Sequence, residues 1–335
     1  MGPGKSREAI GSKERIDVLG LGAVAIDEIL VVPVFPRADT KAHVESRSIR
    51  FGGLTGNALV AASRMGARSA FGGVLGCDEA SDRVLDYLAG QGVDVRSTRR
   101  RTGVGPIRST ILIGRGDGTR TVLSERNGYV GPDLDWPPAD LIRNCRVLFV
   151  DHVGVTAQAR AASIARAEGI PVVADFERAA GADFPTLLEL ADHLIVERGF
   201  AAELTGDADP ARAACILANR NRSVAVVTAG AEGCWMAVGD DPNSLHHQPA
   251  FCVEVVDTTG CGDVFHGVYA AALAEGRPLA ERVSLAAAAA ALNAALARIP
   301  DRLEIETFLN AGPAVLPVRP RLPRPESQVI RAEAV

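Results

Sequence analysis

The chain has 335 residues, of which 47% are hydrophobic and 23% are charged, and its net charge is -5 at neutral pH. This composition is ordinary for a globular protein, and the length suits one large α/β domain with ample core material. The mild negative charge excludes a global basic field that would recruit nucleic acid or an anionic membrane surface. We therefore expect a small-molecule partner, with no nucleic acid and no membrane.

The cysteines are scattered, and none forms a C-x-x-C pair or lies near histidines at the spacing of a zinc site. This usage is typical of a reducing cytosol. The first 15 residues lack the apolar core of a secretory signal, and no run approaches the ~20 apolar residues of a membrane span. The sequence therefore predicts a cytoplasmic protein. The six cysteines are Cys77, Cys145, Cys215, Cys234, Cys252 and Cys261.

The first part of the chain mixes strands, helices and polar segments. Residues 1–15 are polar and glycine-rich, which predicts a disordered lead. Residues 38–53 alternate weakly and are polar on both faces, as in an exposed strand or flap. Residues 107–128 predict a β-hairpin that turns at Gly116-Asp117-Gly118. Between these segments we expect two strands within 16–32, a strand over 69–76, and helices over 56–66 and 78–92.

Short apolar strands then alternate with alanine-rich helices. Uninterrupted Val/Ile/Leu runs predict strands that are buried on both faces, and hence a mostly parallel sheet covered by helices. The segment 313–335 is rich in proline and arginine and is expected to be a frayed tail. The predicted strands are 147–151, 170–176, 193–197 and 224–230.

The stretch D-T-T-G-C-G-D at 257–263 places two glycines and a carboxylate where an alanine-rich helix begins. On spacing alone it could be only a strand, a turn and a buried helix. Glycines at a helix N-terminus, however, leave backbone N–H groups uncovered at the positive end of the helix dipole, which suits a phosphate. A carboxylate beside that anion site would repel a bound phosphate, so its presence indicates a function. The obvious function is to take a proton from a hydroxyl that attacks the phosphate. We therefore interpret Asp263 as a general base.

This stretch resembles the D-T-x-G-A-G-D signature of the PfkB, or ribokinase-like, carbohydrate kinases. The resemblance covers roughly residues 16–312, which would form the kinase domain. It implies a three-layer α/β fold with a mostly parallel central sheet and a small β lid from about 38–53 and 107–128. It also implies an enzyme, a phosphotransferase that moves the γ-phosphoryl group of MgATP to a hydroxyl of a small sugar or sugar acid. Many members dimerise through the lid, so a homodimer is expected.

The resemblance also assigns site residues to this sequence. Residues 51–67 look like the N-terminal signature that lines the sugar site, and residues 228–233 look like the T-x-G-x-x-G loop beside the nucleotide. The catalytic set would be Asp263 with an anion hole at Gly260, Cys261 and Gly262. Substrate would be bound by Asp27, Gly52, Gly53 and Asn57, and ATP by Thr228, Gly230, Gly233, Asp257 and Thr259.

The sequence departs from the family pattern at three places. Many members carry N-x-x-E, which helps to order magnesium, where this chain has Glu197-Arg198-Gly199-Phe200. Glu197 keeps an oxygen ligand, whereas Phe200 cannot contribute one. A loop near the adenine and a potassium site looks shortened at 292–302, so activation by a monovalent cation is left open. Cys261 replaces the commoner alanine, and we interpret it as an inert residue.

Several alternatives compete with the kinase interpretation. Residues 20–25, G-L-G-A-V-A, followed by Asp39, fit a dinucleotide fingerprint, but the β-branched segment with Pro33 and Pro36 that follows cannot form the required helix. Asp27 could be only a turn residue, and Asn57 could be only a helix cap. A non-catalytic sugar or nucleotide sensor on the same fold is a second candidate. A nucleoside kinase is a third, which the lid disfavours because Phe51 is its main aromatic residue.

The acceptor is not named by the sequence. The expected lid and its flanks carry many arginines, most of which would be solvated charges on exposed strands. We expect Arg108, Arg120 and Arg126 to share a face of the hairpin, where Arg120 and Arg126 would pair with an anionic group of the substrate. This favours an acidic sugar slightly over a neutral one. The arginines are Arg37, Arg47, Arg50, Arg108, Arg115, Arg120 and Arg126.

Overall fold

The computed structural model describes residues 15–116, 119–125, 128–218, 222–239, 241 and 244–311. The expected lead, apart from its last residue, and the expected tail at 313–335 lie outside the described residues. The same holds for Asp117 and Gly118 of the predicted hairpin turn and for Arg126.

The core of the fold is an eight-stranded sheet with the order β14-β13-β12-β11-β10-β9-β1-β4. The strands from β4 to β12 are paired in parallel, and β13 and β14 extend the sheet in antiparallel fashion. This confirms the predicted mostly parallel sheet. Its strands are β1 (Ile16–Gly20), β4 (Ser69–Phe71), β9 (Cys145–Asp151), β10 (Val172–Asp175), β11 (His193–Glu197), β12 (Val224–Thr228), β13 (Cys234–Ala237) and β14 (His246–Gln248).

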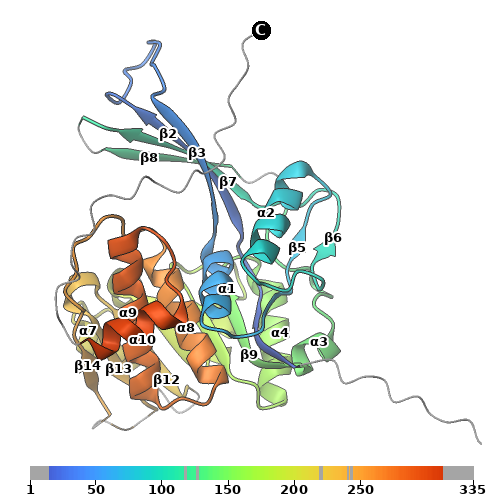
Figure 1. The fold of residues 1–335 in the computed structure, drawn as a ribbon. Coiled ribbons are helices and arrows are strands. Elements are labelled where there is room, and N and C mark those ends of the chain that lie inside the picture. The colour runs from blue at the N-terminus through green and yellow to red at the C-terminus, as the bar shows by residue number, and fades with distance from the viewer. Residues whose placement is uncertain are drawn as a thin grey trace, which may run out of the picture.

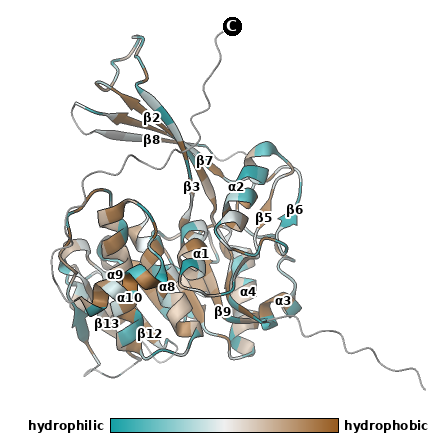
Figure 2. Ribbon diagram, in the orientation of Figure 1, coloured by the Kyte–Doolittle hydropathy of each residue, from teal (hydrophilic) through white to brown (hydrophobic). Residues whose placement is uncertain are grey.

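Helices cover both faces of this sheet, as Figure 1 shows. Successive residues of a strand point to opposite sides, so Val147 and Phe149 of β9 enter one hydrophobic cluster while Leu148 and Val150 enter the other. Figure 2 shows the resulting apolar strands between helices of mixed character. The helices are α1 (Leu54–Arg64), α2 (Glu79–Gly90), α3 (Ala139–Arg143), α4 (Val155–Ala167), α5 (Phe184–Leu190), α6 (Arg198–Thr205), α7 (Pro210–Leu217), α8 (Cys261–Ala274), α9 (Leu279–Leu296) and α10 (Arg302–Asn310).

A second sheet of four strands, with the order β3-β2-β7-β8, projects from the body of the molecule (Figure 1). It consists of β2 (Ala25–Val32), β3 (Ser46–Gly52), β7 (Ile107–Gly114) and β8 (Arg120–Glu125). The predicted strand at 38–53 is shorter than expected, because residues 38–45 form no strand. A strand, not a helix, follows residues 20–25, as the branched residues and prolines predicted.

The predicted strand at 69–76 is divided into two. It breaks at Gly72 and Gly73, and the remainder, β5 (Val74–Leu75), pairs with β6 (Arg99–Arg100) in a small separate sheet. A Cβ at Gly73 would lie 2.3 Å from the ring of Phe71, so a side chain at this position would have to displace that buried ring.

One helix, α9, is long and apolar enough to cross a membrane by length and composition alone. In the structure it packs against α8 and α10 and buries residues such as Val283 and Leu292. Close packing against neighbouring helices is therefore sufficient to explain its alanine-rich sequence.

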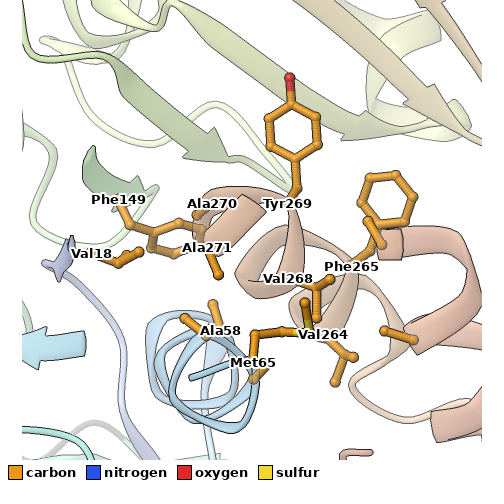
Figure 3. Close-up of a cluster of buried hydrophobic side chains, with 14 of the residues drawn as sticks. Val18, Ala58, Met65, Phe149, Val264, Phe265, Val268, Tyr269, Ala270 and Ala271 are labelled. Atoms are coloured by element: carbon orange, nitrogen blue, oxygen red, sulfur yellow. The ribbon is translucent and has the colours of Figure 1, made fainter. Parts of the chain in front are cut away.

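Helices α1 and α8 lie in direct contact across the core. Figure 3 shows Val264 and Val268 of α8 beside Ala58 of α1 and Met65, which directly follows α1. The closest approach is at Gly267, where an added Cβ would lie 2.1 Å from the carbonyl oxygen of Ala58. Only glycine allows the two backbones to come this close.

We therefore expect Gly267→Ala to lower the free energy of unfolding by about 1–3 kcal/mol, because the methyl group must push the helices apart. Urea-induced unfolding measures this change. Gly90→Ala at the end of α2, where an added Cβ meets nothing within 4 Å, is the matched control and should not be destabilised. An unchanged unfolding curve for Gly267→Ala would contradict the close contact.

Candidate active site

The N-terminus of α8 is the centre of the candidate site. Gly260 is its N-cap in the left-handed conformation (φ 76°), and no side chain among the described residues caps this helix. The first-turn N–H groups have no acceptors within the helix, so they face outward at the positive end of the dipole. One of the three predicted anion-hole positions is partly occupied, because the N–H of Cys261 donates to the Thr258 carbonyl at 3.2 Å.

Gly262 lies in the first turn of α8 and borders open space. An added Cβ would meet nothing within 4 Å, and its backbone is helical, so the protein alone does not require glycine here. Gly260 differs, because its positive φ disfavours any side chain whatever the space. The free volume beside Gly262 is where a phosphate would approach the helix end.

Asp263 and Asn57 come from the two motifs at 257–263 and 51–67, and they lie in direct contact. The Asn57 side chain on α1 donates from Nδ2 to Oδ2 of Asp263 on α8 at 2.7 Å, across 206 residues of sequence. Neither side chain is fully buried, so the pair can meet a ligand. Asn57 is therefore not an N-cap of α1; that position belongs to Gly53, and no side chain caps the helix among the described residues.

The environment of Asp263 controls its charge. Burial, followed by the Asp175 carboxylate, raises the pKa of Asp263 well above its usual range, while the hydrogen bond from Asn57 and the nearby His266 act in the opposite direction. A base must be ionised, and a raised pKa also makes the carboxylate a better proton acceptor near neutral pH.

The two predicted sugar-site glycines are fixed by the geometry of α1. Gly53 has a φ of 88°, and an added Cβ would lie 2.8 Å from the Ala23 carbonyl oxygen. A Cβ at Gly52 would approach the Asn57 amide at 3.2 Å. Gly52 thus leaves room for the Asn57 amide, and Gly53 lets the start of α1 pack against the backbone of residues 23–25. Asp27 lies in the middle of β2, where the ladder places it between Arg50 of β3 and Ser109 of β7.

Arg50 links the small sheet to the stretch 257–263. Its guanidinium donates to Oδ2 of Asp257 at 2.9 Å, and the other oxygen of Asp257 accepts the Thr259 N–H at 2.9 Å. Because Arg50 and Asp27 are paired residues, they lie on the same face of the sheet. That face is therefore the one turned toward α8.

The register of β7 and β8 corrects the expected arrangement of arginines. Arg108 pairs with Glu125 and Arg120 with Ile113, so residues 108 and 120 lie on opposite faces of the hairpin. Residue 120 is on the face of Asp27 but four rows away, about 13 Å along the strand. Arg108 instead pairs with Asp78 on α2 at 3.0 Å. The predicted shared face is wrong for Arg108, since the turn register could not be read from the sequence.

The residues predicted to bind the nucleotide differ in their surroundings. Thr228 ends β12 next to Glu197, which ends β11, so both lie at the carboxyl edge of the sheet. Gly230 borders open space, whereas a Cβ at Gly233 would lie 2.0 Å from the Gln248 carbonyl oxygen. Packing against the strand β14 therefore explains Gly233 without a ligand.

Glu197 and Phe200 show how the metal motif has changed. Phe200 is buried beside Phe184 in the core, so it supplies packing and no metal ligand. Glu197 is exposed and caps α6 by accepting the Gly199 N–H at 2.7 Å. Within the described residues no three His, Cys, Asp or Glu side chains are grouped as a metal site. Magnesium in nucleotide sites is held mostly by phosphates, water and one or two carboxylates, which this edge can supply.

Cys261 is half-buried, and its sulfur accepts the Asn293 amide at 3.3 Å. Burial raises the pKa of the Cys261 thiol, so it is not a thiolate near neutral pH. We expect Cys261→Ala to keep kcat within about threefold of the native enzyme, because alanine fits the same space and loses only a weak sulfur contact. A steady-state assay tests this, and an inactive variant would show that the sulfur takes part in the reaction.

Two buried residues near α8 were missed by the sequence interpretation. Asp175 ends β10, and His266 lies one turn after Asp263. A carboxylate that closes an apolar strand at the ligand edge of a parallel sheet was the available signal for Asp175. The i, i+3 spacing from Asp263 was the signal for His266.

Residues 15–296 match the family model described as pfkB family carbohydrate kinase. The chain belongs to this family. It is 26% identical to the ribokinase of Haemophilus influenzae, over 87% of this chain and 97% of that protein. It is 27% identical to the ribokinase of Mus musculus, over 78% of this chain and 83% of that protein. These findings confirm the predicted family and its reaction class, a phosphotransferase that acts on a sugar hydroxyl.

The fold of this carbohydrate kinase is also confirmed by solved structures. The ribokinase of Arabidopsis thaliana superimposes with a TM-score of 0.76 over 88% of this chain and 99% of that one, at 21% identity. The predicted three-layer ribokinase-like α/β fold is therefore correct.

Proposed function

We propose that this kinase transfers the γ-phosphoryl group of MgATP to a hydroxyl of a small sugar, with Asp263 as the general base. The observation that carries the proposal is the hydrogen bond between Asn57 and Asp263 at the uncapped end of α8. This contact brings Asn57, which is expected to bind sugar, next to Asp263, the expected base. Both lie at a helix N-terminus that suits a transferring phosphate.

The chemistry follows from these positions. The sugar hydroxyl would lie beside Asp263, which removes its proton as the oxygen attacks phosphorus. The backbone at Gly260, Cys261 and Gly262 and the helix dipole would stabilise the charge on the transferred group. ATP brings the phosphoryl group and Mg²⁺ neutralises its charge; Thr228, Gly230, Asp257, Thr259 and, for the metal, Glu197 are the residues that would hold them.

Related structures support these ligands. The Arabidopsis thaliana ribokinase was solved with ribose and ATP, and an E. coli protein of the same fold was solved with ATP and Mg²⁺. The proposed lid role for β2, β3, β7 and β8 rests on the Arg50–Asp257 contact between that sheet and the phosphate-binding stretch. A homodimer, a cytoplasmic location and an effect of potassium stay predictions.

We favour a neutral sugar as the acceptor. Arg47, Arg50, Arg108 and Arg115 each form an ion pair with an acid, which leaves fewer cations for an acidic substrate. The row that contains Asp27 continues into Ser109 and Ser124, whose hydroxyl groups suit sugar hydroxyls.

The test is ADP release with a panel of neutral sugars, sugar acids and nucleosides, in potassium and in choline salts. We expect a neutral sugar to give the highest kcat/KM. A best substrate that is acidic, and that loses its advantage in Arg120→Gln, would restore the acidic-sugar hypothesis. ADP release that no acceptor stimulates would contradict the proposed function.

A further inference from the structure

His266 lies directly behind the candidate base and is almost fully buried, with 5% of its surface exposed. Its ring bridges α8 and the large sheet. Nδ1 lies 2.7 Å from the carbonyl oxygen of Gly262, one turn earlier in α8, and Nε2 lies 3.0 Å from the carbonyl oxygen of Ile195 in β11. The residue therefore connects the phosphate-binding turn to the strand that ends at Glu197.

Both contacts of the ring require it to donate. A carbonyl oxygen only accepts hydrogen bonds, and a neutral imidazole carries a single N–H. Either neutral tautomer would leave a bare ring nitrogen against a carbonyl oxygen at hydrogen-bond distance, which is repulsive in a buried site. The doubly protonated ring donates to Gly262 and Ile195 at once.

Negative charge surrounds this ring. Asp175 is 4% exposed, its Oδ2 has no hydrogen-bond partner among the described residues, and that atom lies 3.4 Å from Nδ1 of His266. Asp263 precedes His266 by three residues, which places the two side chains on the same side of α8. Glu177 lies close enough to influence Asp175, Asp263 and His266.

The remaining titratable groups around the cluster come from β9 and its end. Asp151 acts on Asp175, and His152 lies 3.5 Å from the Glu177 amide nitrogen. Burial raises the pKa of Asp175, and that of Asp263 is raised by burial and by Asp175. Two such carboxyl groups resist joint ionisation unless a cation lies between them.

Burial lowers the pKa of His266, and the carbonyls of Ile195 and Gly262 and the carboxylates of Asp263 and Glu177 oppose this shift without cancelling it. The two short contacts nevertheless favour the charged ring, because each carbonyl oxygen needs a donor. We propose that His266 is a positioning residue that acts as a buried imidazolium, which keeps Asp263 ionised and fixes the Gly262 carbonyl in the first turn of α8. The role in catalysis rests on the proposed function of Asp263 as base.

The charge on the ring can be tested without turnover. In the full-length, unliganded protein labelled with ¹⁵N-histidine, the His266→Gln variant identifies the His266 signals. We expect both ring nitrogens of His266 to be protonated near neutral pH. His193 is an internal control, because burial and Arg282 lower its pKa to about 3 and it should carry one N–H. A singly protonated His266 at a pH where the enzyme works would overturn the proposal.

The effect on the base is tested by the pH dependence of kcat/KM. In His266→Gln the acidic limb should move up by about one pH unit, because Asp263 loses a neighbouring positive charge. In Asp175→Asn it should move down, because a negative neighbour is lost. A merely structural role of His266 would leave the acidic limb of both variants in place. Acidic limbs that shift in the same direction in His266→Gln and Asp175→Asn, or that do not shift, would contradict the proposal.

His193→Gln serves as the matched variant and should leave the limb in place, since that histidine contacts Tyr269 away from Asp263. Thermal unfolding checks that each variant is folded, and if His266→Gln does not fold, the ring spectrum of the native protein decides the matter. Failure of the base itself is distinguishable, because Asp263→Asn would then remain active whatever the charge of His266.

Discussion

We expect Asp263→Asn to lower kcat by ~10²–10⁴ while the affinity for ATP stays nearly unchanged. Asparagine retains an oxygen that can accept the hydrogen bond from Asn57, so the geometry at the end of α8 is preserved and only the proton acceptor is lost. Steady-state kinetics and calorimetric titration with ATP measure the two quantities.

The same variant has a defined effect on pH dependence and stability. In the native enzyme kcat/KM should rise with pH through the raised pKa of Asp263, because the base works only when ionised, and the variant should lose this limb. An acid whose folded-state pKa is raised loses stability as pH increases through that value. Asparagine removes this loss, so the variant should be at least as stable as the native enzyme at neutral pH and above.

An exposed first-turn residue of α2 provides a control, since Asp82→Asn changes the same chemical group on a side chain that pairs with Arg100, and it should keep full activity. Near-native turnover of purified Asp263→Asn would remove the base assignment, whereas the family membership would stand.

The second large effect is expected at Gly262. Gly262→Ala should abolish most activity, with kcat at least ~10²-fold lower, because the added methyl group occupies the space through which a phosphate reaches the helix end. The fold should gain stability, by about 0.5–1 kcal/mol, because alanine replaces glycine inside a helix at a position where its Cβ meets nothing.

This pairing of lower activity and higher stability separates a ligand effect from a folding defect. Chemical denaturation gives the stability, and the sugar-dependent release of ADP gives the activity. Gly90→Ala is the control for an open helical glycine elsewhere and should retain activity. Gly260→Ala would be harder to interpret, because its positive φ makes any loss partly conformational. Full activity of Gly262→Ala would show that the phosphate binds elsewhere.

Much of the large sheet could be predicted because its signal is local. Runs such as residues 147–150 and 194–196 are apolar at every position, which is the pattern of strands buried on both faces. The small sheet was harder, because β3 mixes polar residues with Ile49 and Phe51 and its limits depend on pairing with β2. The register of β7 with β8 is a property of the paired strands and cannot be read from either strand alone, so the faces of Arg108 and Arg120 could not be derived.

The sequence predicts a candidate site only where its motifs are contiguous. The stretch from Asp257 to Asp263 predicts an anion site, because its glycines and the start of a helix are adjacent in the sequence. The bond between Asn57 and Asp263, and the approach of His266 to Asp175, join segments that are distant in sequence. Such contacts follow from how helices pack, and a single sequence without the fold does not contain them.

The close contact at Gly267 has a consequence for motion during turnover. Asp263 and Asn57 sit on two helices whose backbones touch one turn from the site, so helix packing fixes the spacing between the proposed base and its amide partner. We therefore expect any opening that admits a sugar to come from the four-stranded sheet, which contacts the segment before α8 through the exposed Arg50–Asp257 pair. An ion pair of this kind contributes little free energy and can break and re-form in each cycle. Differences in acceptor size among relatives should accordingly be absorbed by the strands of that sheet, while the base and its amide partner keep a fixed separation.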